Sequence, residues 1–314
     1  MKLGFFTAIL PDLTFARVLQ FAAENNFECV EVACWPSGKA ERKFAGVTHI
    51  DVNGFSQARA DDVNGMCAQY SVGISALGYY PNPLDPDPVA SNKAVQHFKQ
   101  VILAAEKLGL KNANTFVGRD WTKTVDENWP RFLKLWKPLI GFAEDHGIKI
   151  GIENCPMSFT RDEWPGGKNL AASPVIWRRM FSDISSRNFG LNYDPSHFVL
   201  QQMDPVSPLA EFSNKMFHMH AKDMTVHREK LNEVGIFAFP KQWHTPRIPG
   251  FGDIDWAKFT AKLYQIGYPG ALCIEVEDDT FGKTLHGRQT ALKISRNVLQ
   301  SFFAQGKPST QSRL

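Results

Sequence analysis

Short apolar runs alternate along the chain with longer segments in which apolar residues recur every three or four positions. The run 148–154 has the length and β-branched content of a buried strand, whereas Phe15, Val18, Leu19 and Ala22 have helical spacing. Eight strand-then-helix units follow one another, and no change of composition marks a domain boundary. The predicted strands cover residues 2–8, 28–34, 72–78, 112–117, 148–154, 189–194, 217–223 and 271–277.

Eight units of this length predict a closed (β/α)8 barrel, a TIM barrel, as a single domain over residues 1–305. The alternative is a doubly wound open sheet. That fold usually has a glycine-rich turn after its first strand, and residues 7–11 contain no glycine. The polar tail 306–314 is predicted to be disordered.

Three segments depart from the simple alternation. Pro130 and Pro138 predict a break or kink in the helix at 125–146. Residues 223–255 form a long insertion after the seventh strand, rich in Gly, Pro and aromatic residues, and we expect an irregular lid or subunit contact there. Within it, the turn 249–252 offers backbone N–H groups that could cradle a phosphate.

Composition excludes several classes of protein. The chain of 314 residues is 43% hydrophobic and 21% charged, and its net charge of +3 is too small to indicate a nucleic-acid partner. The five cysteines form no C-x-x-C pair, which predicts reduced thiols in the cytoplasm. No apolar run approaches the ~18 residues that span a bilayer. A short apolar N-terminus resembles a signal peptide, but Pro11 and Asp12 interrupt it.

Candidate chemistry lies at the ends of four successive predicted strands, which carry Glu153, Asp194, His220 and Glu275. Side chains alternate along a strand, and the carboxyl ends of neighbouring barrel strands meet on one rim. A single acid at a strand end is usually solvated or ion-paired. Four strands in succession with the same ending predict instead one metal site.

One imidazole and three carboxylates suit Mn²⁺, Mg²⁺ or Co²⁺ better than a thiolate site would. Such an ion can bind adjacent hydroxyl and carbonyl oxygens of a sugar and stabilise an enediolate. A carboxylate beside it can then move a proton between carbons. Glu153 and Glu275 lie at opposite ends of the arc, where they could flank the substrate.

Five motifs together resemble the xylose-isomerase-like barrel superfamily, in particular its sugar phosphate isomerase/epimerase branch, with ketose 3-epimerases and inosose isomerases as relatives. They are Ile152-Glu153-Asn154, Tyr193-Asp194-Pro195-Ser196-His197, His218-Met219-His220-Ala221-Lys222-Asp223, Pro249-Gly250-Phe251-Gly252-Asp253-Ile254-Asp255-Trp256 and Ile274-Glu275-Val276-Glu277-Asp278. The resemblance implies that Glu153, Asp194, His220 and Glu275 bind one divalent ion. That ion is usually manganese, with Mg²⁺, Co²⁺ or Zn²⁺ as alternatives. It also implies that Glu153 and Glu275 are the acid/base pair.

Four further residues are predicted to bind substrate: His197, Lys222, Asp223 and Arg247. The alternatives are a helix-capping role for His197 and a surface ion pair for Lys222 and Asp223. Arg228 competes with Arg247, which we favour because it adjoins the glycine-rich turn.

Other polar and aromatic residues are assigned structural roles. His218 is predicted to be a core histidine one layer below the rim, and Glu31, Glu277 and His49 to be structural rim residues. Trp35, Tyr80 and Phe116 could form an apolar wall for a sugar, with ordinary packing as the alternative.

The sequence therefore predicts a cytoplasmic, metal-dependent sugar isomerase or epimerase, with a small sugar as its partner and a homo-oligomer left open. A lyase or hydratase acting on a 3-keto sugar or dehydro acid would use the same site. An apurinic endonuclease would need histidines at the ends of the third and fourth strands, and none is there. A non-catalytic sugar-binding barrel is the remaining alternative.

Overall fold

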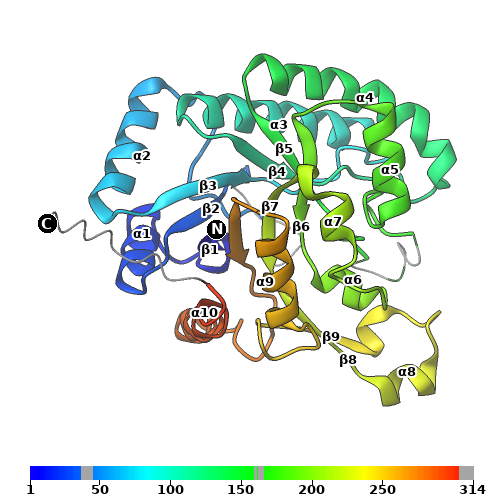
Figure 1. Cartoon of the computed structure of the whole chain (residues 1–314). Coiled ribbons are helices and arrows are strands. Elements are labelled where there is room, and N and C mark those ends of the chain that lie inside the picture. Colours follow the sequence, from blue (N-terminus) through cyan, green and yellow to red (C-terminus); the bar gives the residue numbers. More distant parts are fainter. Residues whose placement is uncertain (37–44, 159–160, 162–165, 304–314) are drawn as a thin grey trace, which may run out of the picture.

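Eight parallel strands close into a barrel in the computed structural model, which describes residues 1–36, 45–158, 161 and 166–303 (Figure 1). The barrel closes where the first strand pairs with the last, and the predicted fold is thereby confirmed. In spatial order the strands are β1 (Lys2–Phe6), β10 (Ala271–Ile274), β7 (Met216–Ala221), β6 (Phe189–Tyr193), β5 (Lys149–Glu153), β4 (Asn112–Thr115), β3 (Gly73–Gly78) and β2 (Cys29–Ala33).

Helices connect the strands and surround the barrel (Figure 1). They are α1 (Phe15–Glu24), α2 (Gln57–Tyr70), α3 (Pro88–Lys107), α4 (Val125–Asp145), α5 (Pro174–Asp183), α6 (Ser196–Leu200), α7 (Pro208–Glu211), α8 (Arg228–Val234), α9 (Trp256–Gln265) and α10 (Leu285–Gln300). Several begin at a side-chain cap: Thr124 and Glu127 form a capping box on α4, and the Asp87 carboxylate accepts hydrogen bonds from the first turn of α3.

Helix α4 is continuous through both prolines, so of the predicted break or kink the break is wrong. Pro130 and Pro138 are both exposed, as are Asp126 and Lys134, whose carbonyl groups lose a helical hydrogen bond to each proline. Water can satisfy these carbonyl groups, so the helix tolerates two prolines on its outer face.

The barrel strands separate apolar from polar side chains by parity. Ile152, Tyr193, Met219 and Ile274 belong to the main hydrophobic core, which includes residues of the surrounding helices. Their neighbours in sequence point to the opposite face of each strand and are largely polar: Gly151 and Glu153, Asn192 and Asp194, His218 and His220, and Cys273 and Glu275. Gly151 shows how crowded the interior is, because a Cβ atom there would lie 2.5 Å from the Asn114 side-chain oxygen. On these four strands the barrel interior is therefore tightly packed and largely polar.

The insertion after β7 is ordered, which corrects the expectation of an irregular segment. It contains an antiparallel hairpin of β8 (Asp223–Val226) and β9 (His244–Arg247), which projects from the barrel with α8 beyond it (Figure 1). The register pairs Asp223 with Arg247 and Val226 with His244. Its alternating, Thr- and Val-containing strands are short, which made them hard to recognise beside so many turn residues.

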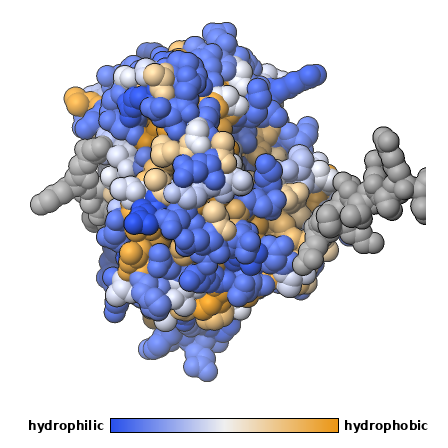
Figure 2. All heavy atoms as spheres, turned by 90° about the vertical axis from the view of Figure 1, so that its left-hand side faces the viewer, coloured by the Kyte–Doolittle hydropathy of each residue, from blue (hydrophilic) through white to orange (hydrophobic). Residues whose placement is uncertain are grey.

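The opposite side of the molecule, near α1 and α2, is mostly hydrophilic, with small separate hydrophobic areas (Figure 2). Among the described residues, no helix is both long and apolar enough to cross a membrane. The predicted disordered tail, 306–314, lies outside the described residues.

Candidate metal centre

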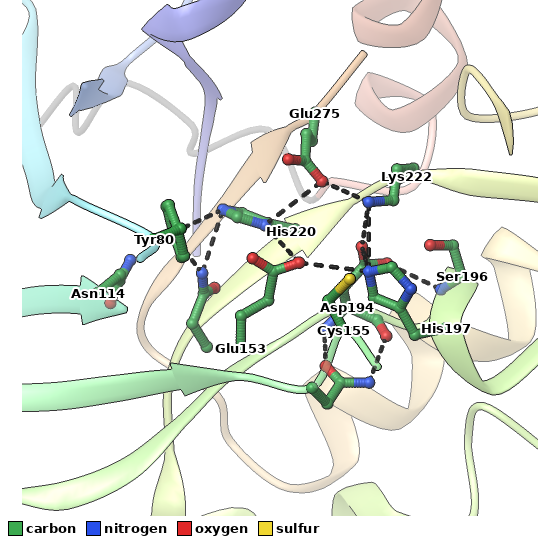
Figure 3. Close-up of polar contacts among 12 residues, drawn as sticks. Tyr80, Asn114, Glu153, Cys155, Asp194, Ser196, His197, His220, Lys222 and Glu275 are labelled. Atoms are coloured by element: carbon green, nitrogen blue, oxygen red, sulfur yellow. Dashed lines mark hydrogen bonds and ion pairs between the residues drawn. The ribbon is translucent and has the colours of Figure 1, made fainter. Parts of the chain in front are cut away.

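The four predicted ligand residues come together at the carboxyl ends of β5, β6, β7 and β10 (Figure 3). One ligand atom from each of Glu153, Asp194, His220 and Glu275 lies within 4.8 Å of the others. Glu153, Asp194 and His220 are buried, and Glu275 is slightly exposed. The cluster is therefore almost fully buried, and its small exposure to solvent is at Glu275.

Asp194 is held from two directions. Its Oδ1 accepts a hydrogen bond from the Ser196 backbone, and Asn154 binds both the backbone N–H and the carbonyl of Asp194. Its Oδ2 is buried and has no hydrogen bond, although cationic groups lie nearby. The backbone after β6 thus aims one carboxylate oxygen into the cluster.

His220 is also oriented by its neighbours. Its Nε2 lies 2.6 Å from Glu31 Oε2, and the ring of Phe6 stacks against the imidazole with a centroid distance of 6.0 Å. Its Nδ1 is buried without a hydrogen-bond partner, 3.9 Å from Glu153 Oε1 and 3.7 Å from Glu275 Oε2. A nitrogen that lacks a partner and faces two carboxylates is the donor atom that a bound cation would use.

Lys222 places an ammonium group among the carboxylates. Its Nζ is 2.6 Å from Glu275 Oε2, 3.0 Å from Asp194 Oδ2 and 3.2 Å from Glu277 Oε2. Burial alone would lower the pKa of Lys222, but these acids raise it well above its usual value. Lys222 is therefore a charged, buried member of the site and not the surface ion pair considered above.

His197, on α6, lies beside the same groups. Its Nε2 is 3.1 Å from Asp194 Oδ2, 3.3 Å from Glu153 Oε1 and 3.3 Å from Lys222 Nζ. The side chain is buried, with its Nδ1 unbonded. His197 accordingly belongs to the wall of the site and does not cap a helix from its surface.

The two glutamates of the cluster have different electrostatic environments. For Glu153, burial raises the pKa, but the hydrogen bond from His197 and the charges of His220 and Lys222 more than offset this and leave it at about 2. For Glu275, burial raises the pKa to about 7, with the charge of Glu153 adding to the effect and Lys222 opposing it. Asp194 has a pKa well below its usual range, because Lys222 and His197 outweigh its burial. In the metal-free site, Glu153 and Asp194 are thus held as anions.

Two other groups of potential ligands are less suitable for a metal. In the group of Glu31, His218 and His220, both ring nitrogens of His218 are used, one by Asn192 Oδ1 at 2.9 Å and one by Ser75 Oγ at 3.0 Å. Burial lowers the pKa of His218 to about 4, so it is a neutral core histidine, as the parity predicts. The group of Glu153, Cys155 and His197 shares Glu153 with the four-residue cluster, and His197 Nε2 already lies 3.3 Å from Lys222 Nζ.

Aromatic residues line the neighbouring part of the barrel. Tyr80 and Phe116 belong to a small apolar cluster with Phe6, Ala8, Ala33 and Met157, and Trp35 packs against it. The rings of Tyr80 and Phe6 lie about 6 Å from that of His220, at 5.9 and 6.0 Å. The three aromatic residues singled out in the sequence therefore share one apolar wall next to the ligand cluster.

Asp223 has a structural role, which corrects its prediction as a substrate-binding residue. Its buried carboxylate accepts hydrogen bonds from the backbone of Met224, Gly250 and Ile254 and from the indole of Trp256. These bonds leave no free face for a sugar hydroxyl. The same contacts argue against phosphate binding by the 249–252 turn. The turn is closed around Asp223, and a Cβ atom on Gly252 would lie 2.2 Å from Asp223 Oδ1.

The two candidate arginines both belong to the insertion. Arg247 is partly exposed, and its Nη1 lies 3.6 Å from Asp278 Oδ1 and 3.4 Å from Thr280 Oγ1, just after the strand that carries Glu275. Arg228 instead binds Gln202 at an exposed position. Of the two, Arg247 is the one associated with the segment that follows Glu275.

The three rim residues predicted to be structural differ in their contacts. Glu277 contacts Lys222, whereas the Nε2 of His49 lies 3.2 Å from the Leu10 carbonyl, a structural contact. Glu31 is predicted from the sequence to be structural only, and its contact with His220 is not predicted. The signal in the sequence was a single acid inside an otherwise apolar strand, on β2.

A divalent cation fits this donor set. Three carboxylates converge on the imidazole of His220, whose buried Nδ1 has no hydrogen-bond partner, and unscreened carboxylates at this separation repel one another. Oxygen-rich sites with one nitrogen donor suit hard or borderline divalent ions. Glu153, Asp194, His220 and Glu275 would hold the ion.

Comparison with known proteins identifies the class. The family model described as "Xylose isomerase-like TIM barrel" matches residues 19–302, and the chain belongs to this family. Over its full length, the chain is similar to the uncharacterized protein YfiH of Bacillus subtilis (strain 168), with 24% identity covering 96% of this chain and 100% of that one. Over a shorter stretch it is 33% identical to the inosose dehydratase of Clostridium tetani (strain Massachusetts / E88), covering 28% of this chain and 30% of that one.

Solved structures show the same fold at low sequence identity. The IolI protein with a bound zinc atom superposes with a TM-score of 0.70 at 18% identity, covering 97% of this chain and 100% of that one. The D-psicose 3-epimerase of Clostridium cellulolyticum H10, solved with D-tagatose, gives a TM-score of 0.65 at 17% identity, covering 95% and 99%. The match of the family model, together with this shared fold, confirms the family resemblance inferred from the motifs.

Proposed function

We propose that this protein is a divalent-metal-dependent isomerase or epimerase that moves a proton between carbons of a sugar or related polyhydroxy carbonyl compound. The observation that carries the proposal is the convergence of Glu153, Asp194 and Glu275 on the unpartnered Nδ1 of His220. Manganese is the ion we favour, on the donor set of three carboxylates and one imidazole. When bound, the ion would supply the positive charge that stabilises a developing oxyanion.

The chain's own residues would carry out the proton transfer. Glu153 and Glu275 come from β5 and β10, on either side of β6 and β7, and so approach the site from different directions. One carboxylate would remove the proton bound to carbon and the other would return a proton, on the opposite face in an epimerisation. Lys222 lies within hydrogen-bonding range of Glu275 and His197 of Glu153, and both would bind substrate hydroxyl groups beside these carboxylates.

The apolar wall would complete the substrate site. The cluster of Tyr80, Phe116 and Trp35 excludes water from one side of the ligand cluster and offers a surface for C–H groups of a sugar. Exclusion of water also protects an enediolate from stray protonation. Glu275 is the most exposed of the four residues, so a substrate would approach them from its side.

A lyase or dehydratase is the second candidate, supported by the sequence similarity to an inosose dehydratase. It would begin with the same proton removal and then expel a hydroxyl group from the neighbouring carbon. Lys222, which lies beside both Asp194 and Glu275, could assist the departing group by hydrogen bonding.

A single experiment distinguishes these reactions. Ketoses, inososes and dehydro acids are incubated with the Mn²⁺-loaded protein in D₂O and followed by NMR and mass spectrometry. An isomerase or epimerase gives a product of unchanged formula with deuterium at one carbon, whereas a dehydratase gives a product lighter by one water. Failure of the fully loaded protein to exchange any carbon-bound proton across this panel would contradict the proposed function.

A further inference from the structure

Glu31 lies on β2, across the barrel from the strands that carry the four ligand residues (Figure 1). Its side chain is completely buried. An unpaired carboxylate is costly in such a place, so its partners indicate its role. They are His220 Nε2 at 2.6 Å from Oε2, Asn114 Nδ2 at 3.1 Å from Oε1, and the Tyr80 hydroxyl, which also donates to Oε1.

The contact between Glu31 and His220 decides which ring nitrogen can bind a cation. A neutral imidazole carries its proton on one nitrogen and a lone pair on the other. A carboxylate only accepts hydrogen bonds, so Oε2 of Glu31 requires the proton to be on Nε2. The lone pair is then on Nδ1, the nitrogen that faces Glu153 and Glu275.

Asn192 suggests the opposite tautomer at first sight, because its Nδ2 lies 3.1 Å from the same His220 Nε2. Its amide orientation is fixed by His218 Nδ1, which is 2.9 Å from Oδ1. The amide nitrogen has another acceptor, however, in the Tyr80 hydroxyl at 2.9 Å. The shorter, charged contact with Glu31 therefore determines the position of the proton.

We propose that Glu31 is a positioning residue, which holds the proton of His220 on Nε2 and thereby presents Nδ1 as the metal ligand. Carboxylates that accept a hydrogen bond from the second ring nitrogen of a ligating histidine fix its tautomer and orient its ring. Here the stacked Phe6 ring restrains the same imidazole from its face. The inference rests on the proposed metal centre, but not on any particular substrate.

The direct test is NMR of wild-type protein labelled with ¹⁵N-histidine and loaded with Zn²⁺, which is diamagnetic. The His220 resonances are assigned through contacts with the Phe6 ring. We expect a one-bond N–H coupling at Nε2 and a metal-shifted Nδ1. A proton on Nδ1 with zinc on Nε2, or no binding of zinc by the wild type, would overturn the inference.

The second measurement is the Zn²⁺ dissociation constant, obtained by competition with a chelator in the absence of substrate. Glu31→Gln removes the charge but keeps the shape of the side chain, and we expect about 10- to 100-fold weaker binding. Asp120→Asn is the matched control: Asp120 is also a buried carboxylate, but it contacts Thr122 and Lys123 and no ligand residue. The Zn²⁺ affinity of Asp120→Asn should stay within about twofold of that of the wild type.

Equal Zn²⁺ affinities of Glu31→Gln and the wild type would contradict the positioning role. An equal loss of affinity in Glu31→Gln and Asp120→Asn would also contradict it, because that result would indicate a general electrostatic effect. Circular dichroism verifies that each variant is folded, and the wild-type NMR result stands without any variant. Neither measurement involves turnover. A protein that binds zinc through Nδ1 but processes no sugar would therefore contradict the proposed function alone.

Discussion

Lys222 Nζ lies 2.6 Å from Glu275 Oε2, and the same ammonium group reaches Asp194 Oδ2 at 3.0 Å. The Lys222 ammonium group therefore already supplies one positive charge at the barrel rim where we propose the metal site. The ammonium group neutralises part of the negative charge that three acids of the ligand cluster, together with Glu277, bring to one place. Its removal should affect the metal-free protein most.

We predict that Lys222→Met destabilises the metal-free protein by about 3–5 kcal/mol, the usual cost of leaving buried charges without their partner. Divalent metal should restore more stability to this variant than it adds to the wild type, because the ion would take over the neutralisation. Urea unfolding with chelator or with Mn²⁺ measures both effects. Lys230→Met, at an exposed ion pair with Glu233, is the control and should change little. A metal-free Lys222→Met variant as stable as the wild type would show that the ammonium group is not needed there.

The two glutamates should separate metal binding from proton transfer. Glu153→Gln and Glu275→Gln keep the shape and an acceptor oxygen, so each variant should retain most of its metal while turnover falls by about 10²-fold or more. His220→Ala should lose metal and activity together, since the other imidazole beside these acids, that of His197, already uses its Nε2 for Glu153, Asp194 and Lys222. Metal analysis and steady-state kinetics measure the two properties. Near wild-type turnover in both Gln variants with metal bound would refute the acid/base assignment.

Arg247 should contribute to substrate binding without affecting the metal. It lies on β9 beside Asp278 and Thr280, so its guanidinium group is near the segment that follows Glu275. Arg247→Ala should raise KM about tenfold, equivalent to ~1.4 kcal/mol, with kcat and metal content largely unchanged. Arg228→Ala is the control from the same insertion, because its partner is Gln202. Loss of metal from Arg247→Ala would instead assign this arginine to the support of the ligand residues.

His97 should make stability depend on pH at a point remote from the ligand residues. Burial lowers its pKa, although the hydrogen bond to the Cys34 carbonyl, at 2.7 Å, and the charge of Asp51 oppose this. The unfolded chain, with an ordinary histidine pKa of ~6.5, therefore takes up the proton first as the pH falls, and acidification favours unfolding. His97→Gln keeps a donor for the Cys34 carbonyl and lacks the titration. The unfolding free energy is measured at pH 7.5 and 5.5, about one unit either side of the ordinary histidine pKa. Over this interval the wild type should lose more unfolding free energy than His97→Gln. Equal losses would contradict the role of His97.

The barrel and the convergence of the four candidate ligands could be predicted because both depend on local periodicity. The alternation along 148–154 and 217–223 places Glu153 and His220 on the inner face, and parallel strands bring their ends to one rim. The contact of Glu31 with His220 could not be predicted in the same way. It joins strands 189 residues apart in sequence and depends on the side-chain packing across the barrel.

The insertion shows a different limit. Its Gly, Pro and aromatic content predicted an irregular segment, but Asp223 organises it by accepting hydrogen bonds from residues up to 33 positions away. The same carboxylate was predicted to bind substrate, because its position after Lys222 resembles a functional motif. Sequence position alone does not reveal that a carboxylate is already satisfied by backbone N–H groups.

The most direct test of the account is anomalous X-ray diffraction from crystals of the protein grown with Mn²⁺, with data collected on both sides of the manganese absorption edge. We predict one strong anomalous peak enclosed by Glu153, Asp194, Glu275 and the Nδ1 atom of His220. No manganese peak at this position, or a peak bound to other residues while these four side chains remain paired with Lys222 and with one another, would contradict the metal centre on which the proposed function rests.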